Sequence, residues 1–219
     1  DYPNFKANKR KVLLEYSAPN IAKPLGVHHL LSTIIGQSLY DIYKKLGYDA
    51  ESINHIGDWG TQFGKLIYAY KTWGEKSIVE KDPIQELLKL YVKFHEEVEK
   101  SPELEDAGRL EFKKFEDGDK ENRELWKWFV DESLKEIQGT YDNLGGIHFD
   151  YTQGESFYED KMSAILEEGK SKKILKEGEE GAYIAEFEDE NMSPLVVQKK
   201  DGATLYSTRD LATIKYRID

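Results

Sequence analysis

The sequence predicts an α/β fold that opens with a parallel sheet and continues into a helical insertion. Residues 11–56 have the pattern of a strand, a helix and a second strand, and residues 83–144 are highly charged with helical periodicity. Two strands joined by a crossover helix normally pair in parallel. At 219 residues the chain is long enough for one large domain or two small ones.

The first strand is predicted from the short apolar run KVLLEY, residues 11–16. A loop follows in which Pro19, Pro24 and Gly26 interrupt any regular structure. The run therefore indicates a buried strand with a sharp exit.

A helix is predicted for residues 30–46. Its apolar residues recur three or four positions apart, and Gly47 stands just past the end as a helix stop. The apolar positions of this amphipathic pattern are Leu31, Ile35, Leu39, Ile42 and Leu46. The stretch YDAESINHI, residues 48–56, then indicates the second strand.

The insertion is predicted to contain helices over 83–100 and 103–144 and short strands over 182–187 and 195–199. Within it, residues 105–124 are compatible with either a loop or a charged helical turn. A turn is expected at 188–194, and Asp201-Gly202 is typical of a hairpin turn. The insertion is therefore α+β.

Composition excludes several classes of function. The 42 acidic residues outnumber the 31 basic ones and give a net charge of −11, which argues against a self-sufficient nucleic-acid binder. The chain has no cysteine, which excludes disulfides, thiolate zinc sites and cysteine nucleophiles. No apolar run approaches the roughly 18 residues that cross a bilayer, and residues 1–11 lack the core of a signal peptide. We expect a cytoplasmic protein without a membrane partner.

The connection SAPNIAKPLGVHH, residues 17–29, is the strongest candidate site. A strand that breaks at Pro and Gly and enters a helix presents free N–H groups and a positive dipole end, which favours anions. His28 and His29 are neighbours and point roughly 100° apart on a helix, so at most one faces a given ligand. A polar helix cap is the alternative interpretation of the pair.

Four ordered segments, quoted from the sequence, carry a family resemblance: EYSAPNIAKPLGVHHLLSTIIG (15–36), NHIGDWGTQFG (54–64), HFDYTQGESFYEDKM (148–162) and KKDGATLYSTRDLA (199–212). Together they resemble the class I arginyl-tRNA synthetases. The resemblance implies a Rossmann-like class I synthetase catalytic fold with an incomplete parallel sheet and a helical α+β insertion. It divides the chain into the first half of the catalytic domain (1–75), the inserted domain (76–200) and the start of the return to the sheet (201–219).

The function that the resemblance implies is that of an arginine–tRNA ligase. Such an enzyme uses ATP to activate L-arginine to arginyl-adenylate and transfers the arginine to tRNA(Arg), and Mg²⁺ is expected with the ATP. We expect tRNA to be contacted mainly through regions absent from this chain, and the chain alone to be impaired. The alternative is a non-catalytic paralogue or arginine-binding module that has lost ATP chemistry.

The resemblance also assigns site residues. Lys23 and His29 match catalytic positions, and His29 would stabilise charge on the α-phosphate. The arginine site would comprise Glu15, Asn20, Tyr206 and Asp210, because a guanidinium is best held by carboxylates. The ATP site would comprise Lys23, Gly26, His28, His29, Asp58, Gly60 and Gln62, and no protein metal ligands are expected.

Three of these residues also have a plain structural interpretation. The structural alternative is a surface acid at a strand end for Glu15, a solvated loop lysine for Lys23, and an acid at a helix N-terminus for Asp210.

The family's first signature is normally His-Val-Gly-His, whereas this chain has Gly26 and His28 in exchanged places. Leu31 also replaces the family's usual arginine. An imidazole at position 28 would fill the volume that a glycine leaves for adenine. We therefore expect weakened ATP binding.

Overall fold

The computed structural model describes residues 8–178, 181–189, 191–200, 202 and 204–219. The chain forms two compact units, the first ending at Gly154 and the second comprising Glu155–Asp219. The sequence predicts a division into catalytic and inserted parts at residues 75/76 and 200/201. That division concerns function, which the two compact units do not test, so it stays a prediction.

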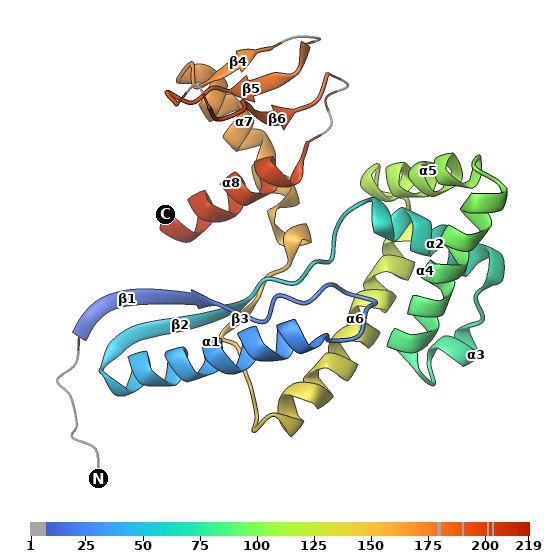
Figure 1. Cartoon of the computed structure of the whole chain (residues 1–219), viewed down its shortest axis with the longest axis horizontal. Helices are drawn as coiled ribbons and strands as arrows, with labels where there is room; N and C mark the ends of the chain where they lie inside the picture. The colour runs from blue at the N-terminus through green and yellow to red at the C-terminus, as the bar shows by residue number, and fades with distance from the viewer. Residues whose placement is uncertain (1–7, 179–180, 190, 201, 203) are drawn as a thin grey trace. The chain divides into compact units, whose positions relative to one another are not determined.

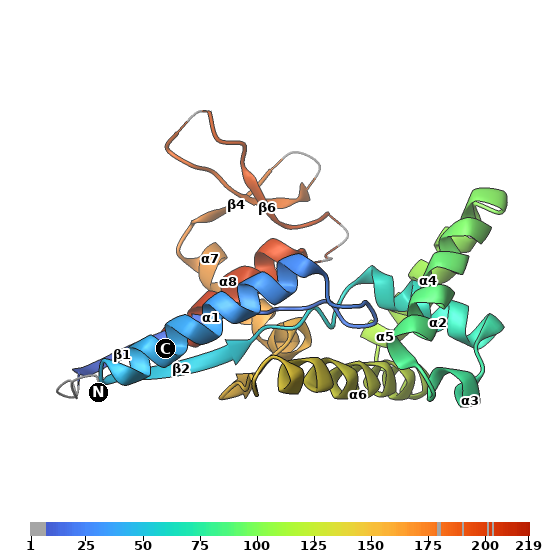
Figure 2. The same cartoon turned by 60° about the horizontal axis from the view of Figure 1, so that its bottom comes forward.

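The sheet of the first unit confirms the predicted strand–helix–strand pattern. Strand β1 (Asn8–Glu15) is followed by helix α1 (Val27–Lys45) and strand β2 (Tyr48–Asn54), and β1 pairs with β2 in parallel. The two-residue strand β3 (Tyr151–Thr152) adds to the other edge of β2, also in parallel. Helix α1 lies alongside β1 and β2, as Figures 1 and 2 show.

The face that α1 turns to the sheet is not its apolar stripe. Its buried residues are Thr33, Gly36 and Tyr40, whereas four of the predicted apolar positions are exposed: Leu31, Ile35, Leu39 and Ile42. A Cβ atom added at Gly36 would lie 2.2 Å from Cβ of Tyr16. The close approach of the helix to Tyr16, just after β1, therefore decides which face is buried, and it requires a glycine at position 36.

Helices make up the rest of the first unit: α2 (Thr61–Trp73), α3 (Lys76–Val79), α4 (Pro83–Lys100), α5 (Leu104–Glu116) and α6 (Lys120–Asn143). The prediction for 83–100 is confirmed at both ends, and the predicted 103–144 helix is broken at residues 117–119. The stretch 105–124, which the sequence left open, is helical apart from this break. Phe94, Phe115 and Phe129 are fully buried between these helices.

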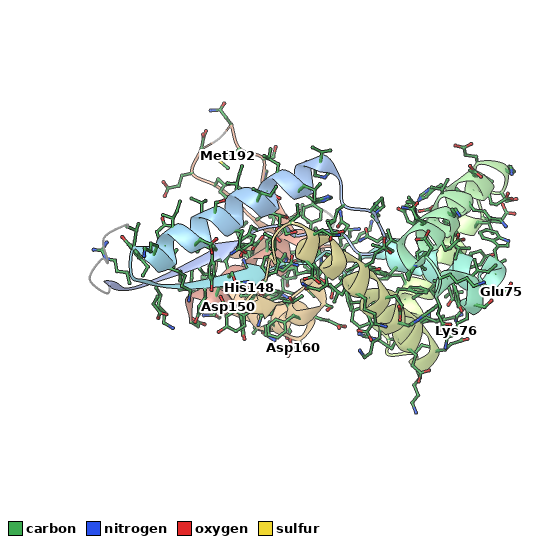
Figure 3. All side chains as sticks on the ribbon, turned by 90° about the horizontal axis from the view of Figure 1, so that it is seen from below. Glu75, Lys76, His148, Asp150, Asp160 and Met192 are labelled. Carbon is green, nitrogen blue, oxygen red and sulfur yellow. The ribbon has the colours of Figure 1, made fainter. Side chains whose placement is uncertain are left out.

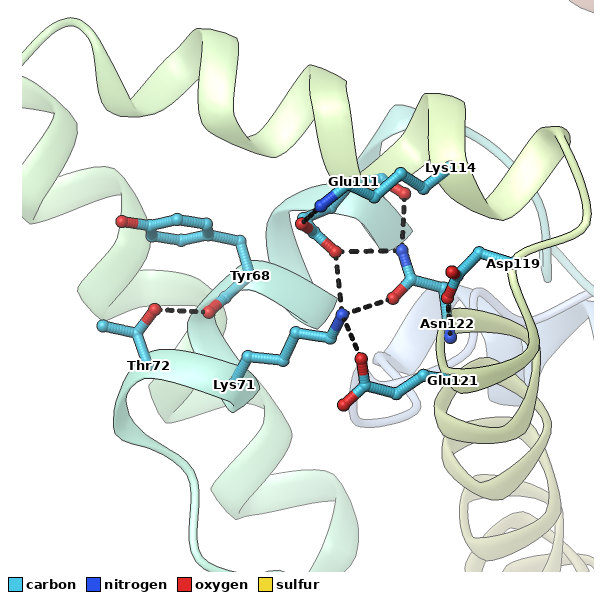
Figure 4. A network of polar contacts seen from close by, with 8 residues as sticks. All are labelled: Tyr68, Lys71, Thr72, Glu111, Lys114, Asp119, Glu121 and Asn122. Carbon is cyan, nitrogen blue, oxygen red and sulfur yellow. Dashed lines mark hydrogen bonds and ion pairs between the residues drawn. The ribbon is translucent and has the colours of Figure 1, made fainter.

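A partly buried charged network joins three of these helices (Figure 4). The Lys71 ammonium of α2 lies 3.0 Å from Glu111 Oε2, 2.6 Å from Asn122 Oδ1 and 2.9 Å from Glu121 Oε2. Lys114 Nζ donates to the other carboxylate oxygen of Glu111 at 2.6 Å. Asn122, which is fully buried, donates to Glu111 Oε2 at 2.9 Å. The network therefore ties α2 to α5 through the Glu111 carboxylate and to α6 through Asn122 and Glu121.

The chain returns to the sheet through residues 148–150. Asp150 Oδ2 accepts hydrogen bonds from the backbone N–H of Ser52 at 2.7 Å and from its hydroxyl at 2.9 Å. Burial acts to raise the pKa of Asp150, but these hydrogen bonds outweigh it and lower the pKa. Figure 3 labels His148 and Asp150 in this segment. The carboxylate fixes the register of the returning chain against β2.

The second unit contains the 3-10 helix η1 (Glu155–Lys161), helix α7 (Met162–Ser171), strands β4 (Leu175–Glu177), β5 (Tyr183–Ala185) and β6 (Leu195–Gln198), and helix α8 (Tyr206–Ile218). The strands form an antiparallel sheet in the order β4-β5-β6. The strands predicted over 182–187 and 195–199 are thus present but shorter. Asp201 of the predicted hairpin turn lies outside the described residues.

In the part of the chain that the structure describes, no helix combines the length and the apolar character that crossing a membrane requires.

Candidate functional site

The exit of β1 is a strained loop that is bound to the exit of β2. Ser17, Ala18 and Ala22 have φ angles of 68°, 49° and 59°. Each such left-handed non-glycine residue costs roughly 1–2 kcal/mol, so the surrounding structure must hold the loop. Gly57 provides part of this hold, because its N–H donates to the carbonyl of Pro19 at 2.9 Å and its carbonyl accepts from N–H of Ile21 at 3.2 Å.

Asn20 lies directly over Gly57, with which it forms a parallel bridge. A Cβ atom at position 57 would lie 2.2 Å from Asn20 Oδ1, so only glycine allows this approach. Glu15 is the last residue of β1 and pairs with Ile53 in register. Both Glu15 and Asn20 are exposed. They stand at the carboxyl ends of parallel strands, where open α/β sheets bind ligands.

Helix α1 begins with a cap that defines the tautomer of one histidine. Gly26 is the N-cap residue, and its N–H donates to Nδ1 of His29 at 3.0 Å. Burial, and then the neighbouring His28, lower the pKa of His29 and favour its neutral form. Because Nδ1 accepts a hydrogen bond, the proton of the neutral ring is on Nε2. His29 is therefore able to donate from Nε2 to a ligand.

His28 is exposed and its ring lies back over the start of the helix. Its ring centroid is 3.9 Å from that of His29. A Cβ atom added at Gly26 would lie 2.7 Å from Cε1 of His28. The imidazole of His28 therefore occupies space that a side chain at position 26 would use. A histidine at position 28 is therefore sterically compatible with a glycine at position 26.

Two predicted ATP residues meet at a small cavity. Lys23 and Gln62 line it together with Tyr91 of α4. The Lys23 ammonium lies over the Tyr91 ring, 5.2 Å from its centroid, within cation–π range. Nothing in the sequence spacing connects Tyr91 with Lys23, and only the packing of α4 against the loop reveals it.

Asp58 and Gly60 belong to the exit of β2. Asp58 is buried, and its carbonyl accepts a hydrogen bond from Nε1 of Trp126 at 2.6 Å. Its carboxylate lies against Gly154, where an added Cβ would be 2.5 Å from the carboxyl carbon. Gly60, with φ of 122°, is the N-cap of α2. The structure thus fixes Asp58 from two sides.

Tyr206 and Asp210 lie in the second unit, one turn apart on α8, and both are exposed. Between them, Ser207 Oγ donates to the carbonyl of Val196 at 2.7 Å, and Arg209 Nη1 lies 2.9 Å from Glu155 Oε2. These contacts anchor the start of α8 within its own unit. That Tyr206 and Asp210 complete one pocket with Glu15 and Asn20 stays a prediction.

Within the described ranges, no group of three His, Asp or Glu side chains is arranged to hold a metal ion.

Comparison with known proteins decides the family. The model of the class I (R) tRNA synthetases, catalytic domain, matches residues 2–219. The chain belongs to this family. It is 53% identical over its full length to an arginine–tRNA ligase of Exiguobacterium sp., and 55% identical over 208 residues, 95% of the chain, to that of Alkaliphilus metalliredigens. The chain spans only 39% and 36% of the lengths of these relatives.

Solved structures agree on the fold. The chain matches the crystal structure of arginyl-tRNA synthetase from Plasmodium falciparum with a TM-score of 0.75 and 33% identity, over 96% of this chain and 35% of that one. The arginyl-tRNA synthetase of Thermus thermophilus matches with a TM-score of 0.74 at 19% identity, over 98% of this chain and 37% of that one, which supports the fold alone. The predicted family and the class I catalytic fold are therefore confirmed.

Proposed function

We propose that the chain supplies the arginine- and ATP-binding region of an arginine–tRNA ligase and acts in the cytoplasm. The observation that carries the proposal is the junction of the two strand exits. It presents Glu15 and Asn20 beside a loop that leads through Lys23 to the first turn of α1, with His29 as a donor. The names of the relatives favour the ligase over a non-catalytic paralogue.

Arginine is recognised at its two ends. Glu15 accepts hydrogen bonds from the guanidinium, whose planar set of donors is matched best by a carboxylate. Asn20 holds the α-amino or carboxyl end of arginine. Tyr206 and Asp210 of α8 would complete the guanidinium site.

ATP is held by the N-terminal end of α1 and by Lys23, with His28, Asp58, Gly60 and Gln62 around it. Mg²⁺ would accompany the ATP phosphates and offset their charge. The arginine carboxylate attacks the α-phosphorus, pyrophosphate leaves, and arginyl-adenylate forms. His29 donates from Nε2 to an α-phosphate oxygen as negative charge builds up there, which is an electrostatic role.

A second step completes the ligase reaction. The terminal ribose hydroxyl of tRNA(Arg) attacks the adenylate carbonyl, AMP leaves, and an ester to the tRNA forms. The net charge of −11 makes this chain a poor tRNA binder by itself. We propose that tRNA is held mainly by parts of the ligase outside this chain.

The alternative function is arginine binding without ATP chemistry. The exchanged Gly26 and His28 favour it, because His28 occupies the position where the family has glycine. Calorimetric titrations of the chain with L-arginine and with ATP-Mg²⁺ distinguish the two. Binding of arginine alone supports the module, and binding of both supports the ligase region.

Arginine-dependent exchange of pyrophosphate into ATP tests the chemistry. It is measured on the chain, with and without tRNA(Arg), and on the complete Exiguobacterium ligase as a positive control. Glu15→Gln is expected to weaken arginine binding at least tenfold while leaving ATP binding unchanged. A chain that binds neither substrate while the complete ligase binds both would contradict the proposal.

A further inference from the structure

We propose that Tyr141 of helix α6 is a positioning residue for the arginine site, acting through its hydroxyl on the strained loop 17–22. The structural part of this inference stands on contacts within the first unit. Its consequence for arginine rests on the proposed function.

The Tyr141 hydroxyl joins the two strand exits. Its Oη lies 2.6 Å from Oγ of Ser17 and accepts a hydrogen bond from Nδ2 of Asn54 at 3.1 Å. Oδ1 of Asn54 in turn accepts from the backbone N–H of Ala18 at 3.1 Å. The three side chains are 2–5% exposed, so water is not a ready substitute for any of these partners. The phenol therefore connects α6 to the backbone of the loop.

These contacts coincide with the strain. Ser17 and Ala18 are two of the three left-handed residues of the loop, and neither is glycine. Such residues persist only where neighbouring contacts determine them. The third, Ala22, donates from its N–H to Oγ of Ser133 at 3.2 Å. Both ends of the strained segment are thus held from α6.

Ser133 and Tyr141 are eight positions apart, which places them on one face of the helix. The face is turned to the loop, and both residues are buried. Asn20 lies inside the segment that they hold. The position of its side chain over Gly57 therefore depends on the α6 contacts.

A purely structural role for Tyr141 would reside in its ring, which packs against Phe149 with a centroid separation of 5.5 Å. Tyr141→Phe keeps that packing and removes only the hydroxyl. Tyr40→Phe is the matched control, because Tyr40 is also buried and its hydroxyl hydrogen-bonds to Asp150 rather than to Ser17 or Asn54. Ser17→Ala removes the same contact from the loop side.

The experiment measures amide hydrogen exchange by NMR and L-arginine affinity by calorimetry on the full chain. In Tyr141→Phe, the Ala18 amide should exchange at least about tenfold faster, and arginine affinity should fall about five- to tenfold, the scale of one lost hydrogen bond. Tyr40→Phe should leave both unchanged at a similar melting temperature. Adding Ser17→Ala to Tyr141→Phe should have less effect than adding it to the wild type.

Equal exchange of the Ala18 amide in Tyr141→Phe and Tyr40→Phe would overturn the inference. So would additive effects of Tyr141→Phe and Ser17→Ala. A wild-type chain that fails to bind arginine, with the exchange result as expected, would instead count against the proposed function. The two failures are therefore distinguishable.

Discussion

Glu111→Gln is expected to destabilise the first unit strongly at neutral pH. Burial acts to raise the pKa of Glu111, but hydrogen bonds from Lys114, Asn122 and Lys71 outweigh it and hold the pKa at about 2, against an ordinary 4.5. At 1.36 kcal/mol per pKa unit, the carboxylate contributes up to about 3 kcal/mol to the free energy of unfolding. Its side chain is only 11% exposed, so screening by solvent is small.

The sign of the pH dependence follows from the direction of the shift. The folded pKa is below the unfolded one, so the contribution is fully present above about pH 4.5 and is lost as the pH falls towards about 2. Glutamine keeps the size of the side chain but carries no charge. The variant should therefore lose stability at pH 7 and show a weaker dependence of stability on pH between 5 and 3.

Urea denaturation at pH 7, 5, 4 and 3 measures both effects. A loss of about 3 kcal/mol at pH 7 fits the removal of one partner from a buried ionic network. Glu97→Gln is the control, because Glu97 pairs with Lys100 at the surface and the pair contributes little. Equal stability of Glu111→Gln and the wild type at pH 7, or an unchanged acid dependence, would refute the reasoning.

Three further predictions test the site and the packing of α1. Calorimetry with ATP-Mg²⁺ should show tighter binding for the double variant Gly26→His, His28→Gly than for the wild type. Gly26→His alone should bind ATP more weakly, because its new side chain collides with the His28 ring. Equal affinities of the wild type and the double variant would contradict the steric argument. Gly57→Ala should weaken arginine binding at least tenfold by displacing the amide that lies over it, and an unchanged calorimetric affinity would show that this amide does not bind arginine. Leu31→Lys and Ile35→Lys should each change the free energy of unfolding by less than about 1 kcal/mol in urea, because both side chains are exposed; a loss typical of core residues would mean that the stripe is buried.

Local patterns sufficed for much of the fold. The parallel pair β1 and β2 follows from two apolar runs joined by a helix, and α4 begins and ends where its periodicity does. The orientation of α1 does not follow, because the amphipathic pattern favours burial of Leu31 and Ile35 whereas the approach of Gly36 to Tyr16 buries another face. β3 has only two residues, which is too short for a period to be recognised.

The candidate site, like the fold, has parts that the sequence predicts and parts that it does not. Asn20 and Lys23 stand in the loop after β1, and His29 stands in the first turn of the helix that follows. The sequence could place them because topology brings the ends of parallel strands to one edge of the sheet. Tyr91 and Tyr141 stand in charged helices far along the chain, where their spacing marks them only as core aromatics. Their contacts with the loop exist only in the folded unit, so no local sequence pattern predicts them.

Helix α6 gives the predicted insertion a direct part in shaping the site. Trp126, Ser133 and Tyr141 are seven and eight positions apart, so they share one face of the helix. They bind the carbonyl of Asp58, the N–H of Ala22 and the hydroxyl of Ser17, which are groups at both strand exits. Separating α6 from the sheet would remove these hydrogen bonds from polar groups of the two strand exits. The conformation of the loop that presents Asn20 is therefore a property of the sheet and the helices together, and neither part determines it alone.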